Sequence, residues 1–421
     1  MPLPRLLGPT AMPNALPILE SEYPAAARLL SPLGRRAELP LGIPQQTAQA
    51  AACERQATIG QITSGSGLPL TLPAIGEHFA GLDPKLAYLY APTAGLKPLR
   101  DLWRAKIGVA RSSLPLVTNG MSHGLSLVAD LFSSPEHPLV LADPFWDNYE
   151  TIWGMRNGAE LRTFPFFDRE RRFNLAGLDQ QLAALRGPAT LLLNFPNNPT
   201  GYTPTQAEAA AILERVLAHP LPLAVLCDDA YATLYFGEDV YAQSLFGALA
   251  ARADRERLLV CKVDGATKEM VFFGGRVGFL TFSADGKAGE ALVEKAGAVL
   301  RGTISSVNAP AQAAVLAALR DPNLPAQQEE VVGVLRRRYH ALHAAFAAQG
   351  VDALPFNSGC FALVQLREGQ DAQTVRMRLI EEQSTGVIAV PSANALRVAF
   401  CSIEEEDIPD LVRRVAAVVN G

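Results

Sequence analysis

Five polar side chains of this sequence stand at, or just past, the ends of short apolar runs. They are an amide, a carboxylate, a phenol, an amine and a guanidinium, contributed by Asn198, Asp228, Tyr231, Lys268 and Arg276. An amine that can condense with a carbonyl, accompanied by a carboxylate and by hydrogen-bond donors, is the set of groups that pyridoxal phosphate requires from a protein. The first hypothesis is therefore a site for this cofactor.

Each of these groups has its own task in such a site. The Lys268 amine would form the Schiff base, and the Asp228 carboxylate would keep the pyridine nitrogen protonated so that the ring accepts electrons. The Asn198 amide and the Tyr231 hydroxyl would donate to the phenolate oxygen. The phosphate needs Arg276 and backbone N–H groups, ideally at the start of a helix.

Two further segments could complete the site. Residues 118–124 follow the apolar pair Leu116-Val117 and precede a helical pattern, so that Met121 and Ser122 would form a phosphate cradle. An aromatic ring should stack on the face of the cofactor, and Trp146 is the candidate.

Continuous apolar runs predict the elements that position these groups. The runs cover residues 137–143, 190–195, 223–228, 258–262 and 277–282. Runs of this kind are typical of strands buried on both faces, and residues 205–218 between them have the pattern of an amphipathic helix. We therefore predict an α/β fold with a mostly parallel sheet flanked by helices. Ligands gather at the carboxyl ends of such strands, which is where Asn198, Asp228 and Lys268 fall.

The length of 421 residues allows two domains. We assign residues 76–310 to a large cofactor-binding domain. From residue 311 the rhythm changes to long helical patterns, followed by strand-like runs at 361–365 and 395–400. A closing helix is expected after a capping box of Ser402 and Glu405. Residues 311–421, together with the arm and segment of residues 1–75, would form a smaller α+β domain.

Composition excludes several classes of protein. A hydrophobic share of 49% with 19% charged residues is typical of a soluble globular chain, and a net charge of −5 argues against a general nucleic-acid binder. The five cysteines are scattered without a CxxC pair, which favours a reducing compartment and no structural metal. We see neither a signal peptide nor a run of about 18 apolar residues, and therefore expect a cytoplasmic protein that does not enter a membrane.

Taken in their order and spacing, these residues resemble the class I/II aminotransferases, which are pyridoxal-phosphate enzymes of fold type I, over roughly residues 60–405. The resemblance implies that Lys268, Asp228 and Tyr231 are catalytic. It implies that Tyr90 reaches the phosphate of the neighbouring subunit in a homodimer with shared active sites. Arg397 would clamp the α-carboxylate of the substrate, and the residues implied to assist it are Asn198 and the backbone near Gly67.

The implied activity moves an amino group between an L-amino acid and a 2-oxo acid by a ping-pong mechanism, and it requires a neutral Lys268 amine. The sequence departs from the family at Gly265, where a serine is usual, and Thr267 is the residue that could compensate. The second arginine of dicarboxylate-specific members has no clear match, since Thr303 falls near its place with Arg301 two residues away. This favours an aromatic or broad neutral amino acid as substrate.

Several alternatives stay open. Lys262 rivals Lys268 at a similar strand end, Trp146 and Tyr90 could be ordinary packing residues, and Arg397 could face outward in a salt bridge. On the same scaffold, a C–S β-lyase or a cyclopropane-forming synthase would need a nearly identical set of residues. A non-catalytic amino-acid sensor is a third possibility, although the N-terminal segment has no module that would read DNA.

Overall fold

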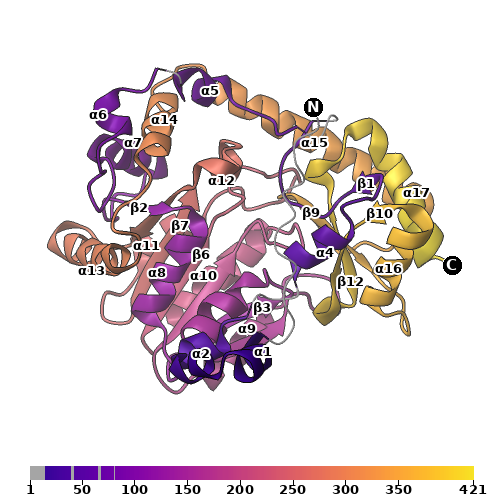
Figure 1. Ribbon diagram of the computed structural model, residues 1–421, viewed down its shortest axis with the longest axis horizontal. Coiled ribbons are helices and arrows are strands. Elements are labelled where there is room, and N and C mark those ends of the chain that lie inside the picture. The colour runs from indigo at the N-terminus through magenta and orange to yellow at the C-terminus, as the bar shows by residue number, and fades with distance from the viewer. Residues whose placement is uncertain (1–14, 39–41, 65–67, 80) are drawn as a thin grey trace.

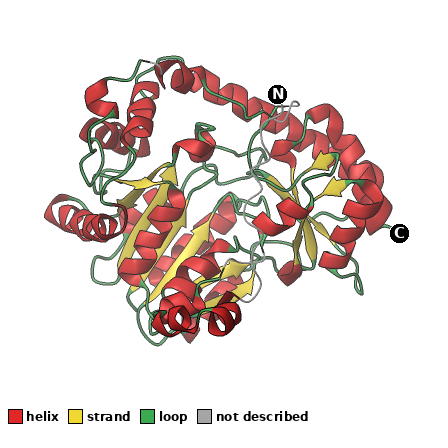
Figure 2. Ribbon diagram, in the orientation of Figure 1, coloured by secondary structure: helices red, strands yellow, loops and turns green. Residues whose placement is uncertain are grey.

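A computed structural model of the chain describes residues 15–38, 42–64, 68–79 and 81–421. Its centre is a seven-stranded sheet with the order β2-β8-β7-β6-β5-β3-β4, in which only β8 runs antiparallel to its neighbours (Figure 2). The strands are β2 (Leu116–Asn119), β3 (Leu139–Asp143), β4 (Leu161–Pro165), β5 (Ala189–Asn194), β6 (Leu223–Asp228), β7 (Leu258–Gly265) and β8 (Val277–Phe282). The mostly parallel α/β sheet is confirmed.

The central strands are buried on both faces, which is why their sequences read as continuous apolar runs. In β6, Val225 and Cys227 pack into one hydrophobic cluster, whereas Leu226 between them packs into the other. Helices cover each face. The first cluster includes residues of α9 (Leu175–Ala184), α10 (Gln206–Ala218) and α11 (Leu245–Arg252), and the second includes α8 (Met121–Phe132). Helix α10 begins after a true capping box, in which Thr205 and Glu208 bond each other's backbone N–H groups.

Further helices lie around the sheet, and the long helix α15 (Leu324–Gln349) runs to the smaller domain, where it packs against α17 (Ile408–Val419) (Figure 1). The others are α5 (Pro73–Phe79), α6 (Pro84–Ala87), α7 (Lys97–Ile107), the π-helix η1 (Glu150–Arg156), α12 (Ala266–Glu269), α13 (Gly286–Ile304) and α14 (Ala309–Ala318). Helix α14 packs against α5, α6, α7 and β8, and its Gln312 accepts a hydrogen bond from the Leu96 N–H over 2.9 Å. Most of the contacts of α14 therefore lie with residues 73–107, with β8 as a further neighbour, and the domain boundary at residue 310 stays a prediction.

The smaller domain is α+β and contains an antiparallel sheet with the order β11-β12-β9. Its elements are β9 (Phe361–Gln365), α16 (Ala372–Gln383), β10 (Thr385–Gly386), β11 (Ile388–Val390), β12 (Ala395–Ala399) and α17 (Ile408–Val419). The N-terminal segment supplies α1 (Ala15–Glu22), α2 (Pro24–Leu29), α3 (Pro32–Arg36), α4 (Ile43–Gln49) and β1 (Arg55–Gln56). Because β1 pairs in parallel with β10 and α4 packs against β11, these two elements join the smaller domain, whereas α3 packs against η1. The assignment of all of residues 1–75 to the smaller domain stays a prediction.

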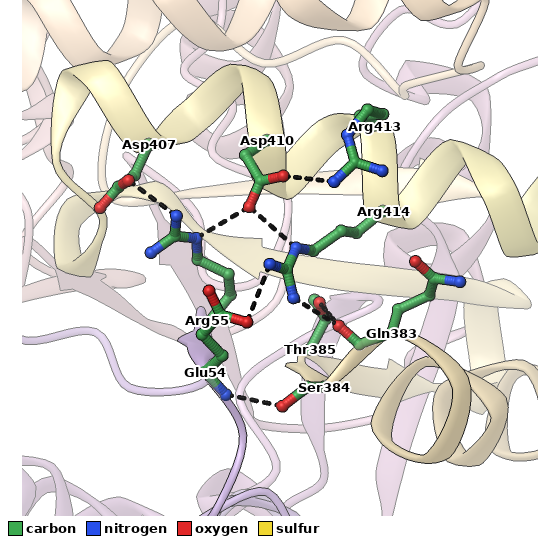
Figure 3. Close-up of polar contacts among 9 residues, drawn as sticks. All are labelled: Glu54, Arg55, Gln383, Ser384, Thr385, Asp407, Asp410, Arg413 and Arg414. Carbon is green, nitrogen blue, oxygen red and sulfur yellow. Dashed lines mark hydrogen bonds and ion pairs between the residues drawn. The ribbon is translucent and has the colours of Figure 1, made fainter.

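A charged network fastens β1 to the end of the chain (Figure 3). Arg55 forms ion pairs with Asp407 over 2.8 Å and with Asp410 over 3.1 Å. Asp410 also accepts from Arg414 over 2.8 Å, and Arg414 in turn reaches Glu54 over 2.9 Å. The carboxylates of Asp407 and Asp410, near the C-terminus, thus hold Arg55 of β1, near the N-terminus.

The predicted capping box of Ser402 and Glu405 is wrong. The Ser402 hydroxyl donates to the carbonyl groups of Gln56 and Ala399, each over 3.0 Å, so it joins β1 to β12. A 3-10 turn at Glu405–Asp407 then precedes α17, which begins without a side-chain cap. Because the Ser402 hydroxyl bonds to the Gln56 carbonyl of β1, it does not cap the helix that follows. Within the described ranges, no helix is both long and apolar enough to cross a bilayer.

Candidate active site

A cavity of about 320 Å³ brings most of the expected site residues together, at the carboxyl ends of the sheet strands and against the smaller domain. The expected residues that line it are Met121, Ser122, Trp146, Asn198, Asp228, Tyr231, Lys268, Arg276 and Arg397. The volume is typical of small-molecule and cofactor sites. Gly67 lies outside the described residues. Tyr90 does not line this cavity and is 92% exposed.

Asp228 ends strand β6 and is only 2% exposed. Its Oδ2 accepts from the Tyr149 hydroxyl over 2.6 Å, and its Oδ1 accepts from the Ala230 N–H over 3.2 Å. Burial raises the pKa of the Asp228 carboxyl to about 6, against the lowering effects of the Tyr149 hydrogen bond and of Lys268. A cationic partner such as a protonated pyridine nitrogen would restore the ionised form, so the carboxylate fits the expected cofactor.

Lys268 stands on the short helix α12, which follows β7 directly. Its amine lies 5.0 Å from the centre of the Tyr231 ring. Burial lowers the pKa of the Lys268 amine, and the Asp228 carboxylate opposes this effect. A lowered pKa is what an amine needs if it is to act as a nucleophile and a base.

Lys262 cannot take this place, because its amine is held elsewhere. It lies within β7, does not line the cavity, and forms ion pairs with Asp229 over 2.5 Å and with Asp264 over 2.8 Å. Asp264 is itself bonded by the Trp103 ring N–H over 3.0 Å. Burial lowers the pKa of Lys262, but the two carboxylates outweigh it and raise the pKa overall. Lys262 is thus part of a buried ionic cluster below the site.

The start of α8 and Arg276 form an anion-binding corner. Gly120 precedes α8 with a φ of 81°, and no side chain caps the helix, so its first N–H groups remain available beside Ser122. A Cβ at Gly120 would lie 2.3 Å from Nη2 of Arg276, so only glycine lets the guanidinium approach the helix start this closely. A phosphate group is the ligand that such a corner favours.

The departure at Gly265 has a steric reason. A Cβ at this position would lie 2.6 Å from the Val277 carbonyl oxygen, so a serine could not stand here without a backbone shift. The nearby Thr267 lines the cavity, and its buried hydroxyl has no hydrogen-bond partner in the described part of the chain. A buried hydroxyl without a partner is costly, and a phosphate oxygen would satisfy it.

Arg397 projects from β12 and is 2% exposed, so the alternative of an outward salt bridge is wrong. Its Nη1 donates to Asn198 Oδ1 over 3.0 Å, its Nη2 donates to the Thr58 carbonyl over 2.7 Å, and its guanidinium lies 4.3 Å from the Phe361 ring centre. Among the described residues Arg397 has no ion-pair partner, and its Nε has no acceptor. A carboxylate ligand would supply both.

The sequence did not reveal three contributors to this site. Tyr149 bonds Asp228, Phe361 supports Arg397, and the segment 58–61 places a carbonyl and three lining residues at the cavity. The one local signal was the spacing of Tyr149 three residues after Trp146, which puts two aromatic rings on one side of a turn. Their ring centres lie 5.5 Å apart.

Comparison with known proteins agrees with this geometry. The family model for aminotransferase class I and II matches residues 58–415. The chain belongs to this family. As an aminotransferase, it is 28% identical over 348 residues to the 2-aminoadipate transaminase of Thermus thermophilus, which covers 80% of this chain and 83% of that one. It is 29% identical over 341 residues to the arginine–pyruvate transaminase of Pseudomonas aeruginosa, covering 79% and 80%.

Solved structures of other aminotransferases share the fold of this aminotransferase. An aminotransferase from Anaerococcus prevotii superimposes with a TM-score of 0.80 at 22% identity, covering 92% of this chain and 99% of that one. The aromatic-amino-acid aminotransferase from Burkholderia pseudomallei, solved covalently bound to pyridoxal phosphate, has a TM-score of 0.73 at 22% identity, covering 91% and 98%. At this identity the likeness shows the fold alone. The family membership makes the chain a transaminase.

Proposed function

We propose that this transaminase uses pyridoxal phosphate to move an amino group between an L-amino acid and a 2-oxo acid by a ping-pong mechanism. The observation that carries the proposal is the pairing, in one cavity, of the Lys268 amine with the buried carboxylate of Asp228. When bound, the cofactor supplies an aldehyde that condenses with amines and a ring that accepts electrons. The side chains of this protein would carry out proton transfer and would bind and orient the substrate.

Lys268 and Asp228 divide the proton chemistry between them. Burial keeps the Lys268 amine neutral more easily, so that Nζ can take the proton from the substrate Cα. The ionised Asp228 would hold a proton on the pyridine nitrogen of the cofactor, and Tyr149 fixes the carboxylate by donating to Oδ2. Trp146 would cover the ring face, while Asn198 and Tyr231 would bond the phenolate oxygen.

The other side chains of the cavity bind and orient. Ser122, Thr267, Arg276 and the first N–H groups of α8 would hold the phosphate, and Met121 lies at the same helix start. Arg397 would hold the substrate α-carboxylate in two hydrogen bonds, in the place where it now contacts Asn198. Gly67 stays a sequence-based prediction for the same task.

The proposed enzyme is a homodimer in the cytoplasm. Tyr90 is exposed beside Tyr88 and Leu89, which are 87% and 64% exposed, and such a patch of large apolar residues is typical of a protein interface. A partner subunit seated there would receive Tyr90 at its own phosphate site. All five cysteines are free thiols, in keeping with a reducing compartment.

The alternatives gain no support from the relatives named above, which are transaminases. No contact among the described residues favours a lyase, a cyclopropane-forming synthase or a sensor over a transaminase. Our sequence-based preference for an aromatic or broad neutral donor stays a prediction. Three carboxylates close to Trp146 and Arg397, those of Asp143, Asp147 and Glu150, favour a cationic side chain instead.

A Lys268→Ala variant tests the function, with Lys287→Ala on the exposed face of α13 as its control. The wild-type and control proteins should bind pyridoxal phosphate, show its visible absorbance band, and lose that band as an amino acid is converted to its 2-oxo acid. The Lys268→Ala protein should release no 2-oxo acid. Wild-type turnover in Lys268→Ala, or no bound cofactor in the wild type, would contradict the proposal.

A further inference from the structure

A second hollow adjoins the active-site cavity. Four residues line both: Ile43, Trp146, Asn198 and Arg397. The walls of the second hollow come from α4, from the turn between β3 and η1, and from β11 with its following turn. Since Arg397 would hold the α-carboxylate, the hollow beyond it is the space that a substrate side chain can enter.

Three carboxylates line this second hollow: Asp143, Asp147 and Glu150. Asp143 accepts from the Ser392 hydroxyl over 2.7 Å, and Asp147 accepts from the Ile43 N–H over 3.2 Å. Neither bond is to a cation, and over the described ranges none of the three carboxylates has an ion-pair partner.

The three negative charges are close enough to act on one another. Partial burial raises the pKa of Glu150, and the charges of Asp147 and Asp143 raise it further. Repulsion of this kind is relieved by a cation placed between the groups. In the part of the chain that the structure describes, no group of three acidic, histidine or cysteine side chains has a metal-binding arrangement, so an organic cation is the better ligand.

Arg397 points independently to the ligand. It is nearly fully buried, its Nε lacks an acceptor, and it is the single cationic side chain among the described residues of the hollow. Burial lowers its pKa, and the negative charge of Asp147 opposes this effect. Once a substrate α-carboxylate neutralises Arg397, the three carboxylates have no remaining positive charge in the hollow.

The lining of the second hollow includes an apolar part beside the polar side chains of Gln46, Thr163 and Gln373. Ile43, Leu161, Ile388 and Val390 form this part together with Trp146. Methylene groups suit such walls, whereas a purely apolar side chain would strip water from three carboxylates without replacing it. An acidic side chain would add a fourth negative charge.

We propose that this hollow is a side-chain subsite for a cation, and that the amino donor is an L-α-amino acid whose side chain ends in an ammonium or guanidinium group. The proposal rests on the transaminase function stated above. Asp143, Asp147 and Glu150 are its specificity-determining residues. Glu150 is the one to change first, because it is exposed and no described hydrogen bond of the fold depends on its carboxylate.

The first test compares donors and variants. We expect kcat/KM for L-lysine and L-arginine to exceed that for L-norleucine and L-glutamate by about ten-fold or more, and Glu150→Gln to lower the lysine-to-norleucine ratio about three-fold, as suits a partly screened charge. Glu150→Lys should lower the ratio further and raise relative turnover of L-glutamate. Glu214→Gln, on the exposed face of α10, should leave the ratio as it is. A preference for norleucine that all three variants share would overturn the proposal.

A binding measurement separates this subsite from the transaminase function. Titration calorimetry of the cofactor-loaded protein with 6-aminohexanoate and with hexanoate compares a cationic and a neutral tail on the same carboxylate. We expect tighter binding of 6-aminohexanoate, with an advantage that shrinks in Glu150→Gln and at high salt. Equal binding of the two acids would overturn the subsite even if transamination occurs. Failure to convert any amino acid, with 6-aminohexanoate still preferred, would instead overturn the transaminase function and keep the subsite.

Discussion

The Tyr149 hydroxyl donates to Oδ2 of Asp228 over 2.6 Å, and both side chains are buried beneath the candidate cofactor site. Burial raises the pKa of Tyr149, and the neighbouring Asp228 charge raises it further, so the phenol remains a donor at every working pH. The same bond lowers the pKa of Asp228 and opposes the effect of burial. Tyr149 is therefore a positioning residue for the carboxylate.

Replacing Tyr149 with phenylalanine should impair Asp228. The loss of a hydrogen bond to a buried charge should lower kcat about ten-fold and move the acid limb of the pH profile to higher pH. Tyr202→Phe is the matched control, because that phenol also donates to a carboxylate, Glu208 Oε2 over 2.8 Å, but outside the cavity. An unshifted pH profile in Tyr149→Phe would show that the bond does not tune Asp228.

The raised pKa of Asp228 predicts a pH-dependent stability of the cofactor-free protein. Between its unfolded pKa near 4 and its folded pKa of about 6, the folded state binds the extra proton, so stability falls as pH rises through this window. Between pH 5 and pH 7 the loss should be about 1 kcal/mol relative to Asp228→Asn, which lacks the titrating group. Urea unfolding of both proteins at the two pH values measures it. A difference between the proteins that does not change with pH would contradict the prediction.

Thr267 should replace the hydroxyl that Gly265 cannot provide. Thr267→Val should weaken pyridoxal phosphate binding about ten-fold, because one charged hydrogen bond is lost, whereas Thr267→Ser should retain it. Equilibrium dialysis against the free cofactor gives both constants without any turnover. A Gly265→Ser change should not rescue Thr267→Val, since its Cβ would collide with the Val277 carbonyl. Wild-type affinity in Thr267→Val would remove the hydroxyl from the site.

Mixing two defective proteins tests the shared active site. Lys268→Ala should be inactive and Tyr90→Ala weak, because Tyr90 is expected to act on the partner. After co-refolding in equal amounts, half of the dimers are mixed, and each carries one intact site, so about a quarter of wild-type activity should return. Co-refolding Lys268→Ala with Asp228→Ala provides the control, because a residue from the same chain and the same site cannot complement. No recovery in the first mixture would place Tyr90 outside the site.

The sequence predicts this fold well where local pattern and burial coincide. The strands that carry Asp228 and Lys268 are buried on both faces, so their apolar runs could be read directly, and the order of polar residues at their ends followed. The strand β4 was missed because only one of its five residues is fully buried. Propensity and pattern give little signal for such a half-exposed edge strand.

The contacts that were missed join distant parts of the chain. Tyr149 meets Asp228 across 79 positions, and Arg397 meets Asn198 across 199. Ser402 misled the helix-start prediction because a carbonyl 346 positions away competes for its hydroxyl. The three carboxylates of the second hollow come from one short segment, residues 143–150, whereas its other walls come from distant segments that only the folded chain brings together. Such relationships are set by tertiary packing and leave no periodic trace in the sequence.

The network around Asp410 has a consequence for how the protein is made. Arg55 precedes Asp410 by 355 positions, so during synthesis the N-terminal segment emerges long before the helix that anchors it. The large domain can form first, as domains generally do on the ribosome, while β1 and the preceding α4 wait without a partner. Because α4 also forms a wall of the second hollow, that wall is assembled last. A nascent or C-terminally clipped chain would therefore have an open cavity before it could select a substrate.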